Sequence, residues 1–402
     1  MNAANRKNIL ILSFTLLVVM LGYSMAMPLL PFYIENFGVG GTELGWLMST
    51  YSFMQLICAS IWGILSDRHG RKPILSIGIL GYAISLLMFG LANSFLMMFI
   101  ARSLSGILSS ATMPTAMAYI GENSPQKERS KGMGQLGAAM GVGVIIGPLV
   151  GGFLSANSLS LPFFVGSGLA GLALLLVLFL LPESRAPEPA AEKKAAPARE
   201  LYLRVLLSPA GILLVLIFIM SFGMTNFQGM IGLYVVDKFA FDTRQVGTIW
   251  MLMGLVLIVG QGVLVGPLSR KFGELQLIKL GLLGGALGFV SVALAFDYLT
   301  VMLALGFFIL ALALIGPALN SYISTFAEKQ QGTVMGLNSA FTSLGRVVGP
   351  LWGGYIYDIK IEYPFISGAV TLALGLLVSL FTLHRQAGDE TTKSWGDIAK
   401  IN

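Results

Sequence analysis

The sequence has 402 residues, of which 55% are hydrophobic and only 11% are charged. Soluble domains carry about a quarter charged residues, so this chain lacks the polar side chains that a water-soluble enzyme of its length needs. Its net charge is +6, and its two histidines and single cysteine exclude a histidine-rich metal site and an intramolecular disulfide.

Twelve apolar stretches are each long enough to cross a bilayer, whose core needs about 20 apolar residues per helix. In chain order they are residues 8–34, 43–65, 73–93, 96–120, 132–154, 162–182, 210–236, 245–268, 275–296, 299–325, 333–356 and 361–384. The first follows Arg6 and Lys7 as a signal peptide would, but it is too long for one, and we expect it to remain as a span. The sequence therefore predicts an all-α integral membrane protein.

The basic residues orient these spans. Twenty of the 25 lie in segments that are cytoplasmic if the amino terminus is cytoplasmic, and only three lie in the opposite loops. Because cytoplasmic loops carry the excess of Lys and Arg, we expect a multi-pass protein of the plasma or inner membrane with both termini in the cytoplasm. The basic charge then records topology, and we expect no nucleic-acid partner.

One polar stretch interrupts the spans. Residues 183–208 are rich in Ala, Pro, Glu and Lys, a composition that cannot bury a core. We expect a cytoplasmic linker there, with its end at 200–208 lying along the membrane surface. The expected organisation is one six-helix bundle at 1–182, the linker, a second bundle at 209–384 and a cytoplasmic tail at 385–402.

The two halves repeat each other in sequence. A glycine–proline pattern of the fifth span recurs in the eleventh at an offset of 202 residues. The loop 63–70 recurs at 266–273, and the segment 114–120 recurs at 317–323, each at an offset of 203. Repeats of six spans predict two pseudo-symmetric bundles with substrate held between them.

Four motifs in correct order resemble those of the major facilitator superfamily and, within it, the twelve-span drug:H+ antiporter family. They are the loop signature at 63–73, the first-span signature at 21–33, Arg102 followed by Gly106 in the fourth span, and the fifth-span pattern at 134–152. The last is similar to the antiporter motif, which distinguishes exporters from importers. The resemblance covers the whole chain and implies the major facilitator fold.

The loop between the second and third spans contains the first group of candidate residues. We expect its glycines to supply a tight reversal and close packing, and Asp67 to face a helix N-terminus. The resemblance implies that Asp67, Arg71 and Glu122 form a cytoplasmic charge relay that locks the halves in the outward-open state. The alternative is a plain turn with topogenic charges. The residues assigned to this gate are Gly63, Asp67, Arg68, Gly70, Arg71, Lys72 and Glu122.

The antiporter motif is the second group. Glycines four residues apart allow close helix packing, and a glycine–proline step also bends a helix. The resemblance implies a pliable, leak-tight seam between the halves; packing alone is the alternative. The residues of the motif are Gly134, Gly143, Gly147, Pro148, Gly151 and Gly152.

Proton coupling is the third expected role. Coupling needs an acid whose pKa is raised by burial, but no acid lies in the middle of a span, which departs from the family pattern. Glu35 and Asp237 come nearest, at the outer ends of repeat-related spans. Arg102 lies within a span, where an arginine costs about 2.5–3.5 kcal/mol, and the resemblance implies that it modulates protonation of an acid. These three residues are the proton-coupling candidates.

The last group consists of polar and soft side chains that are candidates for lining a substrate cavity. Methionines and aromatic residues suit an adaptable apolar pocket, and Arg346 could attract anionic substrate groups or extend to the membrane surface. The candidates are Tyr23, Gln55, Gln135, Met140, Asn226, Gln261, Asn320, Asn338, Phe341 and Arg346.

The sequence contains no nucleotide-binding P-loop, no serine-hydrolase elbow and no HExxH motif. We therefore expect a transporter rather than an enzyme, without a cofactor and powered by the proton gradient. The main hypothesis is a monomeric, proton-driven exporter of hydrophobic, cationic or neutral small molecules that works by alternating access in the lipid bilayer. The alternatives are a sugar or metabolite permease or symporter, a lipid-handling transporter, and a membrane sensor on the same scaffold.

Overall fold

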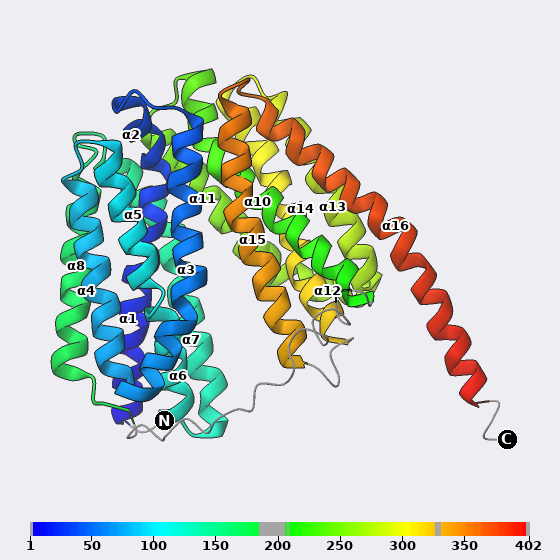
Figure 1. The fold of residues 1–402 in the computed structure, drawn as a ribbon, viewed down its shortest axis with the longest axis horizontal. Helices are drawn as coiled ribbons and strands as arrows, with labels where there is room; N and C mark the ends of the chain where they lie inside the picture. The colour runs from blue at the N-terminus through cyan, green and yellow to red at the C-terminus, as the bar shows by residue number, and fades with distance from the viewer. Residues whose placement is uncertain (1–2, 185–205, 207–208, 326–330, 399–402) are drawn as a thin grey trace. The chain divides into compact units, whose positions relative to one another are not determined.

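The computed structural model describes residues 3–184, 206, 209–325 and 331–398, and within these ranges every regular element is helical (Figure 1). The first six predicted spans are formed by α1 (Ala3–Ala26), η1 (Met27–Leu29), α2 (Leu30–Asn36), α3 (Gly41–His69), α4 (Arg71–Gly90), α5 (Phe95–Ser109), α6 (Thr112–Asn123), α7 (Gln126–Leu154) and α8 (Leu161–Leu180). The other six are formed by α10 (Pro209–Phe239), α11 (Thr243–Val259), η2 (Gly260–Leu264), α12 (Val265–Phe272), α13 (Glu274–Ala293), α14 (Tyr298–Thr325), α15 (Gln331–Tyr357) and α16 (Tyr363–Ile398).

Eleven helical segments of the described chain are long and apolar enough to cross a membrane. The remaining predicted span, 333–356, is occupied by α15. The helix α16 continues to Ile398, beyond the predicted end of its span at 384. The surface helix expected at 200–208 and most of the predicted linker lie outside the described residues.

The described chain divides into two compact units. The first contains the described residues up to Ser184 together with 228–255 and 350–361. It therefore holds the first six spans and the ends of α10, α11 and α15 that the sequence places on the outer side. The second contains the remaining described residues. The bundle boundaries predicted from sequence stay a prediction.

In the first unit, α1 packs against α7 and α8. Its core is a cluster of buried apolar residues from α1, α4, α6, α7 and α8 and from the residue after α8. The cluster consists of Ile9, Ile11, Leu12, Leu16, Leu75, Ile79, Ala116, Tyr119, Ile120, Leu136, Ala173, Val177 and Leu181.

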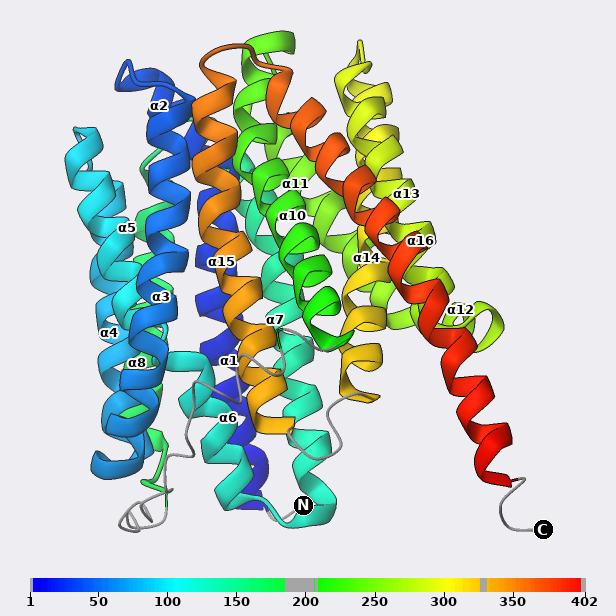
Figure 2. The same cartoon turned by 45° about the vertical axis from the view of Figure 1, so that its right-hand side comes forward.

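In the second unit, α13 packs against α14 and α16 (Figure 2). Phe227, Phe289 and Phe308 meet at the centre, and the Phe227 ring centroid lies 4.2 Å from that of Phe308.

Large apolar side chains remain on helix surfaces, such as Phe179 and Leu303, which are 78% and 65% exposed. Lipid solvates such faces, so the exposure accords with a membrane protein.

Candidate functional site

Glycines of the antiporter motif bring α7 directly against α1. A Cβ at Gly143 would stand 2.6 Å from the Leu17 carbonyl oxygen, and a Cβ at Gly151 would stand 2.6 Å from that of Met25. Ser24 bridges the two helices, since its Oγ lies 3.0 Å from the Gly143 carbonyl oxygen. The close packing expected of these glycines is therefore present, and a larger residue would push the helices apart.

The same arrangement recurs between α10 and α15 in the second unit. Thr225 Oγ1 lies 3.0 Å from the Gly345 carbonyl oxygen, and a Cβ at Gly349 would overlap the Thr225 side chain. Thr225 follows Ser24 by 201 residues, within one residue of the repeat offset. The sequence repeat thus extends to a side-chain contact.

In the first unit, α7 also meets α11 at points where backbone lies directly against backbone. A Cβ at Gly247 would stand 2.6 Å from the Pro148 carbonyl oxygen, and one at Gly152 would stand 2.5 Å from that of Thr243. The Thr243 hydroxyl donates to the Gly152 carbonyl oxygen at 3.1 Å. The motif therefore contacts the second sequence half through its outer end. No described atom lies within 4 Å of a Cβ at Gly134.

The corresponding contact joins α15 to α3. A Cβ at Gly45 would overlap the Pro350 carbonyl oxygen, and one at Gly354 would overlap that of Gly41. Both glycines stand at the repeat offset of 202 from their counterparts in the α7–α11 contact. We call these two contacts the outer seams.

The end of α15 also caps α3. Asp358 Oδ1 accepts a hydrogen bond from the Gly41 N–H at 2.7 Å, and Oδ2 accepts from the Thr42 N–H at 2.9 Å and the Thr42 hydroxyl at 2.5 Å. The first N–H groups of a helix lack partners within the helix, and the helix dipole favours an anion there. A single carboxylate thus holds two helices of different sequence halves together.

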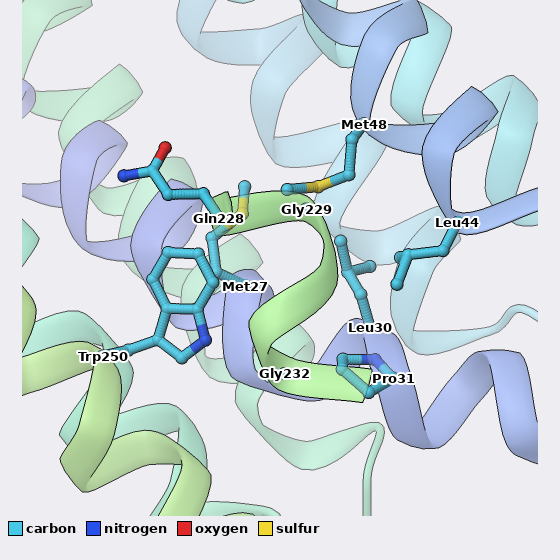
Figure 3. Close-up of a pocket in the computed structure, with 9 residues that line it drawn as sticks. All are labelled: Met27, Leu30, Pro31, Leu44, Met48, Gln228, Gly229, Gly232 and Trp250. Carbon is cyan, nitrogen blue, oxygen red and sulfur yellow. The ribbon is translucent and has the colours of Figure 1, made fainter. Parts of the chain in front are cut away.

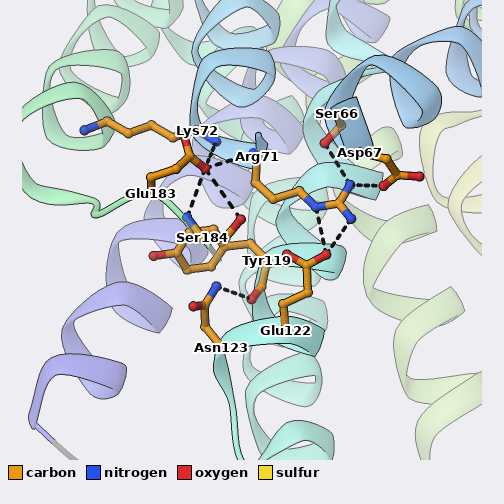
Figure 4. Close-up of polar contacts among 9 residues, drawn as sticks. All are labelled: Ser66, Asp67, Arg71, Lys72, Tyr119, Glu122, Asn123, Glu183 and Ser184. Carbon is orange, nitrogen blue, oxygen red and sulfur yellow. Dashed lines mark hydrogen bonds and ion pairs between the residues drawn. The ribbon is translucent and has the colours of Figure 1, made fainter. Parts of the chain in front are cut away.

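At the ends predicted to face the cytoplasm, Arg71 joins two acids (Figure 4). Its Nη1 lies 2.6 Å from Asp67 Oδ1, and its Nε and Nη2 lie 3.0 Å and 2.5 Å from Glu122 Oε1. Ser66 Oγ accepts a further bond from Nη1 at 3.0 Å. The structure thus brings together the three residues of the expected relay. The Asp67 side chain is 53% exposed, which leaves one side of it open to another partner.

The turn before this cluster is made by Gly70. Its φ of +92° lies in the left-handed region that favours glycine, and a Cβ there would stand 3.0 Å from the Glu183 carboxyl carbon. Glu183 Oε1 accepts hydrogen bonds from the backbone N–H groups of Arg71 and Lys72 at 2.9 Å and 3.1 Å. Glu183 therefore caps α4, and the Lys72 side chain points away from it (Figure 4).

Two other residues assigned to the gate do not join this cluster. Gly63 lies inside α3, which continues to His69, and no described atom lies within 4 Å of a Cβ placed there. Its expected role in the reversal and in close packing is therefore wrong. Arg68 is exposed in the last turn of α3.

Arg102 of α5 is 2% exposed and lies among aromatic side chains. Its guanidinium carbon is 5.4 Å from the Tyr23 ring centroid and 4.6 Å from that of Tyr51, within cation–π range. Its Nη2 lies 4.0 Å from the Met48 sulfur, and its Nε has no hydrogen-bond partner among the described residues. The structure brings Arg102 to Tyr23 but pairs it with no described carboxylate.

The two acids proposed for coupling have different surroundings. Glu35 is exposed near the end of α2. Asp237, near the end of α10, accepts a hydrogen bond from the Tyr357 hydroxyl at 2.6 Å. Only Asp237 is thus tied to another helix by its carboxylate in the contacts of the described chain.

A narrow crevice lies in the first unit (Figure 3); its space between atoms, about 180 Å³, includes open solvent and has no room for a water molecule. Its lining is largely apolar, with the amide of Gln228 and the indole of Trp250 as the polar side chains; Trp250 Nε1 has no hydrogen-bond partner among the described residues. The lining residues are Met27, Leu30, Pro31, Leu44, Met48, Gln228, Gly229, Gly232 and Trp250.

Of the predicted cavity residues, the structure brings Asn320 and Asn338 together, with Asn338 Nδ2 donating to Asn320 Oδ1 at 2.7 Å. Asn226 is fully buried and its amide donates to the Pro364 carbonyl oxygen at 2.8 Å, so it serves packing. The remaining candidates are half-buried or exposed: Gln55, Gln135, Met140, Gln261, Phe341 and Arg346.

Sequence reasoning missed Asp358 and Glu183. The start of α3 held one available signal: Gly40 occupies the position at which the repeat has Asp242, so the residue before the helix has no side chain to cap its first turn. That gap pointed to a carboxylate from elsewhere without identifying it.

Three comparisons bear on identity. A family model described as "Major Facilitator Superfamily" matches residues 12–329 and 295–400. "Multidrug resistance protein 2" of Bacillus subtilis (strain 168) is 34% identical over 372 residues, covering 91% of this chain and 93% of that protein. "Quinolone resistance protein NorA" of Staphylococcus aureus (strain COL) is 29% identical over 382 residues, covering 94% and 97%.

Among solved structures, a bacterial homologue of the human lysosomal transporter Spinster, in an inward-facing and unoccupied conformation, has a TM-score of 0.74. It is 15% identical in sequence, and the match covers 95% of this chain and 96% of that one. At this identity the likeness concerns the fold alone.

Proposed function

The chain belongs to the Major Facilitator Superfamily and is a multi-pass membrane transporter, not an enzyme, and we propose that it exports hydrophobic small molecules in exchange for protons by alternating access. Similarity to multidrug resistance proteins over more than nine-tenths of both chains supports drug efflux. The polar side chains of the crevice are one amide and one indole. Such a lining does not favour a sugar, which needs several hydrogen-bond partners.

The observation that carries this proposal is the pair of outer seams. In both, glycines place the backbone of one helix directly against the backbone of the other. Such contacts can separate and re-form with little rearrangement of side chains. Two seams related by the repeat are what a pair of rocking bundles needs on its outer side.

On the cytoplasmic side, the cluster of Asp67, Arg71 and Glu122 acts as the gate in this proposal. Arg71 is held by both acids, while the exposed side of Asp67 is available to a second partner when the halves approach there. Breaking that contact would let the carrier open inward.

In this proposal, Asp237 binds the proton that is exchanged for substrate. Protonation would weaken its hydrogen bond from Tyr357, the last residue of α15, which is next to the Asp358 that caps α3. A proton bound at Asp237 would thus act on the end of α15 that forms an outer seam. It must bind the outward and inward states with different affinities to drive transport. Glu35 and Arg102 remain further candidates.

The same proposal includes the cellular setting: a monomer in the plasma or inner membrane, both termini cytoplasmic, with the proton gradient in place of a cofactor. The basic residues of the loops support this orientation.

The test uses everted membrane vesicles energised by respiration and a panel of lipophilic cations, neutral compounds and carboxylic acids. We expect uptake of panel members into vesicles with accompanying proton release, both abolished by an uncoupler. Asp67→Asn should cripple uptake at unchanged protein level. Absence of uncoupler-sensitive uptake across the panel would reject the proposal, and normal uptake by Asp67→Asn would remove the gate.

A further inference from the structure

Two arginines of this chain present the same edge to different partners. The Nε and Nη2 of Arg71 lie 3.0 Å and 2.5 Å from one carboxylate oxygen of Glu122. In Arg102, Nη2 lies 4.0 Å from the Met48 sulfur, and Nε has no partner within the described residues. We propose that this edge of Arg102 binds the carboxylate of the transported molecule, so that the substrates are amphipathic carboxylates; this inference rests on the transport function proposed above.

No carboxylate among the described residues pairs with Arg102. The side chain is 2% exposed, and its contacts in the described chain are two tyrosine rings and a thioether, all neutral. Cation–π contacts offset only part of the cost of a guanidinium within an apolar span. Because the guanidinium is already desolvated, an arriving anion does not have to strip water from it, which strengthens the ion pair.

Tyr82 of α4 supplies a second unused donor on the α1 side of this cluster. It is 2% exposed, and its hydroxyl has no hydrogen-bond partner among the residues that the structure describes. The hydroxyl lies against Gly22, which precedes Tyr23, and the Tyr23 ring faces the Arg102 guanidinium. Gly22 of α1 leaves room for it, since a Cβ there would stand 2.7 Å from Tyr82 Oη. A carboxylate has two oxygens that can each accept several hydrogen bonds, so one group can satisfy both donors.

Met48 connects this charged cluster to the crevice. Its sulfur contacts Arg102, and the same side chain lines the crevice, where it extends toward α10 near Gly229 (Figure 3). Methionine is flexible and unbranched, so a change of rotamer removes this wall at small cost. In this proposal the closed crevice widens when Met48 moves, and its apolar lining and the unpaired Trp250 Nε1 then receive the body of the ligand while Arg102 receives its carboxylate.

The positive charge of Arg102 also selects against cationic substrates. A permanent cation placed in the same crevice would meet an unneutralised guanidinium across one methionine side chain, in a medium of low dielectric constant. The class of substrate therefore shifts from the lipophilic cations expected from the sequence to molecules that join an apolar body to a carboxylate.

The test measures binding, which needs no gradient, with purified protein in phosphatidylcholine nanodiscs. The probes share a dansyl group on an alkyl chain: dansylaminoundecanoic acid, its methyl ester and dansylcadaverine, which is a cation. We expect the acid to bind about tenfold more tightly than the ester, as a charge-assisted bidentate contact requires, and the cation to bind most weakly. Arg102→Gln should remove the preference for the acid and leave ester affinity unchanged.

The matched control is Arg244, an exposed arginine whose guanidinium lies 5.6 Å from the Phe153 ring centroid. Arg244→Gln removes a charge over an aromatic ring without touching the crevice and should keep the preference for the acid. If Arg102→Gln fails to fold in a thermal unfolding assay, Tyr82→Phe decides instead: it should reduce the acid preference by about threefold, the effect of one hydrogen bond.

Equal binding of acid and ester by the wild type, tighter binding of the cation, or an equal loss of acid and ester in folded Arg102→Gln would each overturn the inference. So would loss of the acid preference when phosphatidylglycerol is added to the nanodiscs, since a lipid phosphate would then be the occupant. Failure of gradient-driven uptake in vesicles would reject the proposed export while leaving these binding results intact, so the two failures are distinguishable.

Discussion

The helices α3 and α11 begin at repeat-related positions, yet their first turns are capped differently. Asp242 precedes α11; its Oδ1 accepts from the Gln245 N–H at 2.8 Å, and the Gln245 side chain accepts from the Asp242 N–H at 3.0 Å. At the position of Asp242, α3 has Gly40, whose N–H donates to Glu43 at 2.9 Å. Gly40 has no side chain, so the capping carboxylate comes from Asp358 at the end of α15.

The difference shows that a helix cap can serve two purposes. A cap supplied by the preceding residue stabilises its helix wherever that helix moves. A cap supplied by Asp358 exists only while the ends of α3 and α15 are together. The α11 cap is therefore a matter of helix stability, and the α3 cap is also a latch on an outer seam.

The largest expected effect is that of Asp358→Ala. Loss of a charged cap costs about 1–2 kcal/mol, which shifts a two-state equilibrium by about tenfold. We expect the outer ends to separate more often. Leu44→Cys in a Cys58→Ser background reports this, because Leu44 is 1% exposed; its labelling by a membrane-impermeant maleimide should be about tenfold faster. An unchanged rate would show that Asp358 is no latch.

The second prediction gives α3 a capping residue directly before the helix, as α11 has in Asp242. In the Asp358→Ala protein, Gly40→Asp gives α3 its own capping carboxylate, and Gly40 already has an extended backbone with φ −110°. Thermal stability should recover by about 1 kcal/mol, while labelling of the cysteine at position 44 stays fast. If labelling also becomes slow, the cap and the latch are not separate functions.

Asp242→Ala is the reverse experiment. Removing a local cap lowers stability by about 1 kcal/mol, and we expect a lower thermal midpoint with no change in the labelling rate. Faster labelling in this variant would contradict the distinction between the two helix starts.

The smallest effect concerns Asp297, a local cap of α14 outside the spans. Hydrogen bonds from the Thr300 side chain and backbone N–H hold the pKa of the Asp297 carboxyl below its usual value. Its folded-state pKa is depressed, so its contribution to stability is present above the unfolded pKa and is lost as pH falls through the folded value.

In Asp297→Ala, acidification from about pH 5 to about pH 3 should therefore lower the thermal midpoint by slightly less than in the wild type. Labelling at position 44 should not respond to this substitution at any pH. A wild-type pH response in the variant would contradict the role of Thr300 in holding the charged form.

The inner turns offer a second comparison between the halves. Gly70 and Gly273 have φ of +92° and +80°, so the reversal itself is repeated. The residue that follows is Arg71 in one copy and Glu274 in the other; Arg71 binds Glu122, whereas Glu274 accepts a hydrogen bond from Ser321. The backbone was retained in both copies while the charge was inverted, which allows the first copy alone to carry the expected relay.

The position of the buried Arg102 also differs between the two copies of the repeat. The repeat offset of 203 places Leu305, which is fully buried, at the position of Arg102. A leucine there needs no partner, whereas a guanidinium does. The buried arginine therefore has no counterpart at the repeat position of the second copy, although the helices of the two copies are repeated.

Much of the scaffold was predictable because its signals are local. Apolar length predicted the spans, and glycine spacing predicted close helix packing, which Gly143 and Gly151 make with α1. Asp67, Arg71 and Glu122 were grouped by resemblance, and they do lie together. Gly63 was assigned to the turn because a motif includes it, but α3 continues past it, and motif membership does not specify packing.

The sequence by itself determined the membrane environment, the twelve spans and the repeat, because hydropathy and glycine periodicity act between neighbours along the chain. Only the tertiary structure decided which carboxylate caps α3 and which groups surround Arg102. Asp358 lies 317 residues from Gly41, and the two tyrosine rings against Arg102 come from two other helices. Hydrogen bonds and buried charges depend on distances of a few ångströms, and folding alone brings such distant residues to that range.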